Sequence, residues 1–187
     1  MTTCLQSGIG LPDIVSIEGE QMAKFGEKFP GKFEDFTDMI NPDDYFPIKI
    51  SECTVDGKII AYPWDSGPCG MFYRSDLFEE AGIKAEDIVT WDDFIEAGKV
   101  LKEKTGVNML CMAESRNDTT YRLLMMEGGG FYFDKDGNTQ VDSDVSIQAM
   151  ETCKKMYDAG ITFNNSSWDD MVAGMGADKF ACIADAV

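Results

Sequence analysis

Aromatic, carboxylate and hydroxyl side chains stand next to one another at Trp64, Asp65 and Ser66. An aromatic plane can stack on the apolar face of a sugar ring, and a carboxylate accepts hydrogen bonds from hydroxyl groups. The trio therefore predicts recognition of a ligand that carries many hydroxyls. The alternative is structural, with the Trp64 side chain packed beneath a hinge and the Asp65 carboxylate capping a turn.

A second polar cluster follows an apolar run over residues 11–17. Glu18, Glu20 and Gln21 offer carboxylate and amide groups where this run, an expected buried strand, passes into a helix. Strand ends commonly present binding groups, so the cluster is a second candidate contact for the same ligand. A solvated helix start is the alternative, because the helix dipole favours acidic side chains there.

A third polar cluster consists of Arg116, Asn117, Asp118 and Tyr121. Its guanidinium, amide, carboxylate and phenol groups can donate to and accept from hydroxyls. For Asp118 alone the role of N-cap of the following helix is the favoured explanation, whereas Arg116 and Tyr121 fit a ligand contact and an ordinary surface position equally well. Trp168, in the first turn of a later predicted helix, is expected to pack on the core rather than to bind a ligand.

The sequence has no histidine, which excludes a Ser-His-Asp triad, a Cys-His dyad and a His-ligated zinc site. The six cysteines form no C-x-x-C pair and several occupy apolar positions, so we expect buried free thiols rather than disulfides. The segment 134–138 partly matches a calcium-binding loop, but Val145 stands where the distal glutamate should be. A hairpin turn is expected there, and neither a metal nor a cofactor is expected.

The formal net charge of the chain is −18, from 34 acidic and 16 basic residues. Nucleic acids and anionic membranes are bound through basic patches, so the composition argues against both as partners. With 44% hydrophobic and 27% charged residues, the chain is typical of a soluble globular protein with a sizeable core. The sequence contains no apolar run of roughly 18 residues, the length of a membrane span, and its N-terminus does not read as a signal peptide.

Strand and helix patterns alternate along most of the chain, which predicts an α/β fold with helices on the faces of a sheet. Strands are expected over residues 11–17, 58–62, 71–73, 107–112 and 180–184. Helices are expected over residues 22–29, 33–40, 76–81, 91–105, 119–127, 144–159 and 168–175, with Ser75, Thr90, Ser143 and Ser167 as N-caps.

Residues 56–82 read DGKIIAYP, WDSGPCG and MFYRSDLFEEAG. This stretch resembles the core signature of extracellular solute-binding protein family 1, the sugar-binding subunits of ABC importers related to the maltose-binding protein. Further family motifs follow in order as TWDDFIEAGKVL, EGGGFYFDKDGNTQVDSD, SIQAMETCKKMYDAG and DKFACIAD. The last departs from the family pattern at Phe180, Ala181 and Cys182.

The resemblance implies a type II periplasmic binding fold with two lobes, truncated here because family members are about twice this length. Residues 1–66 would be part of lobe one, ending at the crossing between the lobes, and residues 67–187 would be most of lobe two. Family members place ligand contacts at the three polar clusters. The carboxylate of the crossing can also fall on the position of Gly67, which leaves the role of Asp65 open.

The implied function is capture of a mono- or oligosaccharide in a cleft between the lobes and delivery to a membrane permease, without chemistry of its own. The protein would be a monomer outside the cytoplasmic membrane, periplasmic or lipid-anchored, with any export signal beyond this chain; six free thiols are unusual there. Two rivals stay open: a glycosidase with a carboxylate pair, and a sensor or adhesion module on the same fold. Amino acids, polyamines and metal chelates stay open as ligands.

Overall fold

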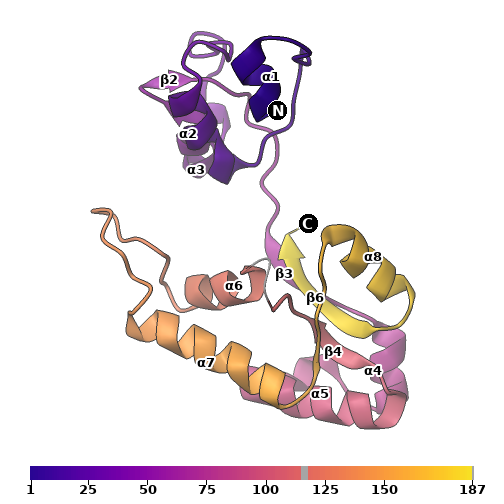
Figure 1. The fold of residues 1–187 in the computed structure, drawn as a ribbon. Coiled ribbons are helices and arrows are strands. Elements are labelled where there is room, and N and C mark those ends of the chain that lie inside the picture. Colours follow the sequence, from indigo (N-terminus) through magenta and orange to yellow (C-terminus); the bar gives the residue numbers. More distant parts are fainter. Residues whose placement is uncertain (115–117, 187) are drawn as a thin grey trace. The chain divides into compact units, whose positions relative to one another are not determined.

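The computed structural model describes residues 1–114 and 118–186, except for the side chains of Glu20 and Ala186. The chain divides into two compact units, Met1–Gly67 and Pro68–Val187, called unit 1 and unit 2 below (Figure 1). Unit 1 is mainly helical with a short hairpin, and unit 2 is a sheet covered by helices. The predicted α/β class is confirmed.

Unit 1 surrounds a small apolar core formed by Ile40, Cys53 and Ile59. Its elements are α1 (Thr2–Ser7), α2 (Gly19–Lys28), the 3-10 helix η1 (Pro42–Asp44), α3 (Pro47–Cys53), β1 (Thr54–Val55) and β2 (Lys58–Ile59). Strands β1 and β2 pair antiparallel across Asp56 and Gly57, whose φ angles are 50° and 75°. Two positive φ angles in a two-residue turn favour an Asp-Gly sequence and fix the register of this hairpin.

The strand predicted over residues 11–17 is wrong, because this part of the described chain has no regular secondary structure. Leu11, Ile14 and Val15 are exposed, with Ile14 91% exposed, and Ile17 is only half-buried. An apolar run becomes a buried strand only where neighbouring strands supply hydrogen bonds and cover one face. None of the described strands pairs with this segment.

The helix predicted over residues 33–40 is also wrong. The Phe36 amide donates to the Ile59 carbonyl at 2.8 Å, and the Ile59 amide donates to Thr37 Oγ1 at 3.0 Å. These bonds dock the segment along β2, so Phe36 and Ile40 pack against the hairpin rather than on a helix face. The helical spacing of the apolar residues was a weaker determinant than the long-range pairing.

Unit 2 is built on a four-stranded sheet in the order β3-β6-β4-β5. The strands are β3 (Cys69–Tyr73), β4 (Asn108–Cys111), β5 (Thr162–Phe163) and β6 (Phe180–Ala186). Strand β3 runs antiparallel to β6, whereas β4 runs parallel to both β5 and β6. The central strands β4 and β6 contain the buried residues of the sheet, whereas all five residues of the edge strand β3 are exposed.

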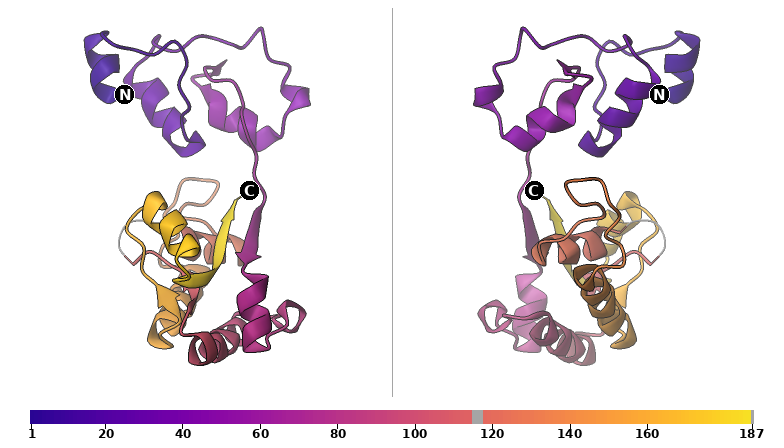
Figure 2. Two further views of the ribbon diagram at one scale, coloured as in Figure 1. Left: turned by 90° about the vertical axis from the view of Figure 1, so that its right-hand side faces the viewer. Right: turned by 90° about the vertical axis from the view of Figure 1, so that its left-hand side faces the viewer.

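Helices cover this sheet (Figure 2). They are α4 (Ser75–Ala81), the 3-10 helix η2 (Ala85–Asp87), α5 (Trp91–Thr105), α6 (Thr119–Glu127), α7 (Asp144–Asp158) and α8 (Trp168–Gly176). Helix α5 packs against α4 and β4, α7 against α6 and α5, and α8 against β6. Gly98 allows the close approach of α5 to the sheet, because a Cβ there would lie 2.9 Å from side-chain atoms of Met109 and Ile161.

Local capping fixes most helix boundaries in unit 2. The side chains of Thr90, Ser143 and Ser167 accept from backbone amides of the first turn, which confirms these N-caps. Ser75 is instead the first residue of α4, and Arg74 is the N-cap, so that prediction is wrong by one residue. Gly82 ends α4 in the left-handed conformation with φ 69°, as expected of a C-terminal glycine.

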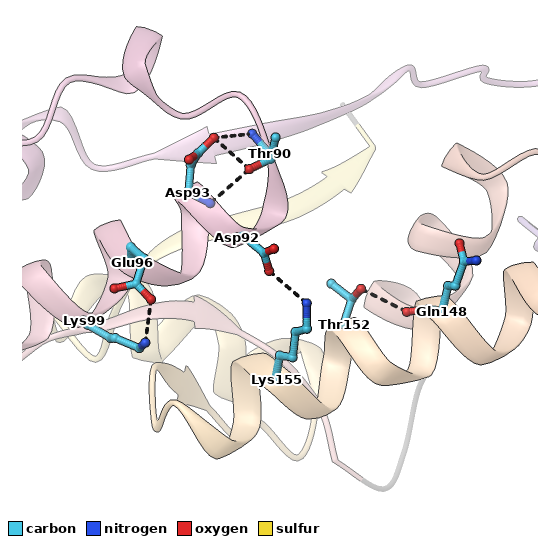
Figure 3. A network of polar contacts seen from close by, with 8 residues as sticks. All are labelled: Thr90, Asp92, Asp93, Glu96, Lys99, Gln148, Thr152 and Lys155. Atoms are coloured by element: carbon cyan, nitrogen blue, oxygen red, sulfur yellow. Dashed lines mark hydrogen bonds and ion pairs between the residues drawn. The ribbon is translucent and has the colours of Figure 1, made fainter.

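A polar network joins the start of α5 to α7 (Figure 3). Thr90 and Asp93 form a reciprocal capping box, and the hydrogen bonds from Thr90 hold the pKa of Asp93 below its ordinary value. The Asp92 carboxylate pairs with Lys155 Nζ across the two helices at 3.0 Å. The ion pair links α5 to α7, whereas the capping box fixes only the start of α5.

All six cysteines lie in the described part of the chain and are free thiols, but the predicted burial holds only for Cys53, Cys153 and Cys182; Cys4 and Cys111 are half-buried and Cys69 is exposed. Burial raises the pKa of Cys182 to about 12, so this thiol is a packing residue and not a nucleophile. The turn at 134–138 is held by the Asp134 carboxylate, which accepts from the amides of Asp136 and Asn138 at 2.9 Å each. None of the described helices is long and apolar enough to cross a membrane.

Arg74 makes the most elaborate ionic contact in unit 2. Its Nε and Nη2 donate to the two oxygens of Asp76 at 2.8 and 2.6 Å, and its Nη1 donates to Asp178 at 2.6 Å. The bidentate bond holds the pKa of Asp76 at about 2, below the ordinary 3.8. Because Asp178 precedes β6, the Arg74 guanidinium links the start of α4 to the start of β6.

We expect the Arg74→Met variant to raise the pKa of Asp76 toward its ordinary value and to lower stability at neutral pH. A carboxylate with a depressed folded pKa stabilises above its unfolded pKa, and that contribution is lost as the pH falls through the folded value. The stability difference between variant and parent should therefore shrink between about pH 4 and pH 2. NMR titration of Asp76 and urea midpoints against pH measure both effects. Lys135→Met is the control, and an unchanged Asp76 titration would refute the role of Arg74.

Candidate functional site

A pocket in unit 1 brings together Trp64, Asp65 and Ser66. Its volume is about 510 Å³. We call it the Trp64 pocket, and it is lined by Asp43, Asp44, Tyr45, Phe46, Lys49, Pro63, Trp64, Asp65 and Ser66. All of these residues belong to unit 1. The pocket therefore combines the segment after β2 with the segment that forms η1 and the start of α3.

The η1–α3 side of the pocket is fixed by local signals. The Asn41 side chain accepts from the Asp43 amide at 3.4 Å, and Pro42 occupies the first position of η1. Pro47 occupies the first position of α3, where its missing amide costs nothing. Two short helical turns in succession thus present the pocket side chains between them.

Aromatic packing positions the two walls relative to each other. The Tyr45 and Tyr62 rings meet edge-on, with centroids 6.2 Å apart and an interplanar angle of 88°. The hydrogen bond that the Tyr45 hydroxyl donates to Tyr62 raises the pKa of Tyr45. Tyr62 also meets Phe36 edge-on at 6.2 Å. Trp64 follows Tyr62 by two residues, so these edge-on contacts of Tyr62 place Trp64 next to η1.

The Trp64 ring is 92% exposed within the described chain, so it does not pack beneath anything in unit 1. Asp65 Oδ1 accepts from the Ser66 amide at 2.7 Å, which is the turn contact that the structural alternative predicted. The second carboxylate oxygen of Asp65 has no hydrogen bond within the described chain. An open aromatic plane beside a carboxylate can stack on a sugar face and accept from hydroxyl groups.

The residues of the second cluster lie at the N-terminus of α2. Glu18 is the N-cap and is exposed, Gln21 is half-buried in the first turn, and the side chain of Glu20 lies outside the described atoms. The described part of unit 1 does not place Glu18 or Gln21 in the lining of the Trp64 pocket. Their role as ligand contacts stays a prediction.

The third cluster lies in unit 2, and two of its members, Arg116 and Asn117, fall outside the described residues. Asp118 is the N-cap of α6, and its carboxylate accepts from the Tyr132 hydroxyl. Tyr121 Oη lies 2.5 Å from Ser146 Oγ, which in turn donates to a backbone carbonyl. Both described side chains therefore link α6 to neighbouring segments of unit 2, and ligand contact by them stays a prediction.

Sequence reasoning missed the η1–α3 half of the pocket. The motif Asn41-Pro42 marked a turn there, but nothing in the sequence connects Tyr45 or Lys49 with Trp64. Trp168 also differs from expectation, because it is 64% exposed in the first turn of α8 instead of packing on the core.

A second, largely apolar pocket of about 550 Å³ lies in unit 2. It is lined by Met71, Tyr73, Phe78, Ala85, Ile88, Val89, Thr90, Trp91, Phe94, Glu127 and Cys182. Its main polar contact is the bond from Trp91 Nε1 to Glu127 at 2.8 Å, so it offers few groups for hydroxyls. Among the described residues, no group of His, Cys, Asp or Glu could hold a metal ion.

Comparison with known proteins identifies the family. The family model described as bacterial extracellular solute-binding protein matches residues 2–185. The chain belongs to this family. A lactose-binding protein of Rhizobium radiobacter is 34% identical over 188 residues, covering 98% of this chain and 44% of that protein. An arabinooligosaccharide-binding protein of Halalkalibacterium halodurans is 30% identical over 149 residues, covering 79% of this chain and 33% of that protein.

Solved structures of the same type confirm the fold. The GacH receptor of Streptomyces glaucescens GLA.O has a TM-score of 0.82 at 21% identity, covering 98% of this chain and 48% of that one. Maltose-bound MalE3 of T. maritima has a TM-score of 0.78 at 22% identity, again covering 98% and 48%. The chain thus spans about half the length of its solute-binding relatives. The predicted family and the type II periplasmic binding fold are confirmed, and the assignment of residues 1–66 and 67–187 to two lobes stays a prediction.

Proposed function

We propose that the protein is the extracytoplasmic binding subunit of an ABC importer, and that it captures a carbohydrate without converting it. Membership in the extracellular solute-binding family supports the location and the binding role. Two relatives are described as binding lactose and arabinooligosaccharides, and one structure of similar fold contains laminaribiose. A membrane permease is the partner that this proposal requires.

The observation that carries the proposal is the composition of the Trp64 pocket. Trp64 offers an open ring of the size of a pyranose, and Asp65 holds an acceptor beside it. A sugar can stack its apolar face on an aromatic ring and donate hydrogen bonds from its hydroxyls to a charged acceptor, and the pocket offers both partners. The other predicted contacts, in the Glu18 and Asp118 clusters, are proposed to add hydroxyl contacts to the same ligand.

The test is calorimetric titration of the complete natural protein that carries this chain with a panel of neutral disaccharides and oligosaccharides. We expect at least one to bind, and Asp65→Asn to weaken it about tenfold or more, because a hydrogen bond to a charged group is worth about 1.5–3 kcal/mol. The matched control is Asp56→Asn, since asparagine also accepts the positive φ of that turn.

Two outcomes would contradict the proposal. The first is a panel in which no carbohydrate binds or raises the melting temperature of the protein. The second is hydrolysis of a bound oligosaccharide that Asp65→Asn abolishes, which would favour a glycosidase that uses a carboxylate pair.

A further inference from the structure

The Trp64 pocket has an unbalanced charge. Three of its lining residues, Asp43, Asp44 and Asp65, carry carboxylates, and one, Lys49, carries an ammonium group. The described part of the chain shows no ion pair to any of these three carboxylates. They are therefore available to a ligand as negative charges.

The single cation of the pocket is already neutralised. Lys49 Nζ lies 2.9 Å from Glu52 Oε2, and both side chains are about two-thirds or more covered. The Glu52 carboxylate is held in place beside the start of α2, where a Cβ on Gly19 would lie only 2.6 Å from it. The lysine thus contributes little positive potential, and the pocket presents a net negative field.

The aromatic lining points to the same ligand charge. Phe46 and Trp64 are both largely exposed, and the faces of aromatic rings attract cations. A protonated amine on a stacked sugar ring would lie beside both the ring faces and the carboxylates. A carboxylate on the same sugar would meet repulsion from each of these groups.

We infer that the Trp64 pocket selects carbohydrates that carry a protonated amino group over neutral sugars, and neutral sugars over acidic ones. This inference rests on the proposed function, because it specifies the ligand of the same site. A unit charge about 4 Å from another in water contributes about fivefold to an equilibrium, and partial covering of the pocket increases that factor. We expect the amino sugar to bind about five- to twentyfold more tightly than its neutral counterpart.

The preference for the amino sugar should come from the carboxylates of the pocket and not from the net charge of the whole chain. At about 0.15 M salt the Debye length is about 8 Å, so the remaining surface charges are largely screened from the pocket. The preference should therefore persist at this ionic strength and decrease toward unity near about 1 M salt, where the Debye length is about 3 Å.

The experiment titrates the complete natural protein with three matched disaccharides that bear a hydroxyl, an amino group or a carboxylate at one position. A simple aliphatic diamine is the fourth probe. Titrations are run at about pH 6, where the amine is protonated. The inference expects affinities in the order amino, neutral, acidic, with the diamine weakest because it has no ring to stack on Trp64.

Substitution of the pocket carboxylates tests the cause. In Asp43→Asn/Asp44→Asn, the ratio of amino-sugar to neutral-sugar affinity should fall to about half or less of its parental value. The control Asp56→Asn should keep the parental ratio, because Asp56 does not line the pocket in the described chain.

Every other outcome of these titrations refutes either the inference or the proposed function. Equal affinity for the amino and neutral sugars, or a preference that survives the double substitution, refutes the inference and leaves the proposed function standing. If the diamine binds as tightly as the amino sugar, the pocket recognises the amine and not the sugar ring, which refutes a selectivity for carbohydrates. Failure of all the sugars to bind refutes the proposed function and the inference together.

Discussion

Trp64→Ala is expected to weaken binding of a neutral oligosaccharide about ten- to hundredfold, equivalent to about 1.4–2.8 kcal/mol. The ring is 92% exposed and lies in the lining of the Trp64 pocket, so its loss removes the plane on which a sugar would stack. Because the ring buries little apolar surface within unit 1, the free energy of unfolding without ligand should change by about 0.5 kcal/mol or less. Calorimetric titration and urea denaturation separate the two quantities.

Two companion variants make this prediction specific. Trp64→Phe keeps a smaller aromatic plane and should recover part of the lost affinity. Trp168→Ala removes another exposed tryptophan, in α8 of unit 2 and outside the lining of the Trp64 pocket. A larger loss of affinity in Trp168→Ala than in Trp64→Ala would contradict the prediction and indicate that the main stacking residue lies in α8.

The largest expected effect on stability comes from Phe180→Ala, at about 3–5 kcal/mol. Phe180 opens β6, is fully buried, and stacks on Phe163 with ring centroids 5.5 Å apart and an interplanar angle of 30°. Helix α8 lies so close that a Cβ on Gly174 would be 2.8 Å from the Phe180 ring. A truncation here leaves a cavity between α8 and the sheet that rigid strands cannot close.

Equilibrium urea denaturation followed by far-ultraviolet circular dichroism measures this loss. Phe133→Ala is the matched control, because it removes the same atoms from a ring that is 58% exposed, and it should cost less than about 1 kcal/mol. A loss in Phe180→Ala as small as the one expected for Phe133→Ala would contradict the prediction and show that β6 is not part of the cooperative core of unit 2.

The sequence alone predicted what local interactions decide. The capping residues Thr90, Ser143 and Ser167 begin their helices as expected, because a cap bonds to amides only two or three residues away. Helix α6 has the predicted bounds of 119–127 and ends before a glycine run, although the Asp118 side chain makes no hydrogen bond to the first turn. The family motifs over residues 56–82 also predicted the fold that the comparisons confirm.

Predictions that depended on partners distant in the sequence were less reliable. The run over 11–17 has the composition of a buried strand, yet a strand forms only when another segment pairs with it. The apolar residues around Phe36 have helical spacing, yet the hydrogen bond to Ile59 holds them along β2 instead. In the first segment no described strand supplies the pairing, and in the second a long-range contact overrides the local pattern.

The same distinction applies to the candidate site. Residue types by themselves singled out Trp64, Asp65 and Ser66, because an aromatic ring, a carboxylate and a hydroxyl in succession have a recognisable chemistry. Only the tertiary structure placed Asp44 and Lys49 beside them, since these residues lie well upstream and reach the pocket through the contact between Tyr45 and Tyr62. The chemistry of single residues is local, whereas the shape and net charge of a pocket depend on which segments the fold brings together.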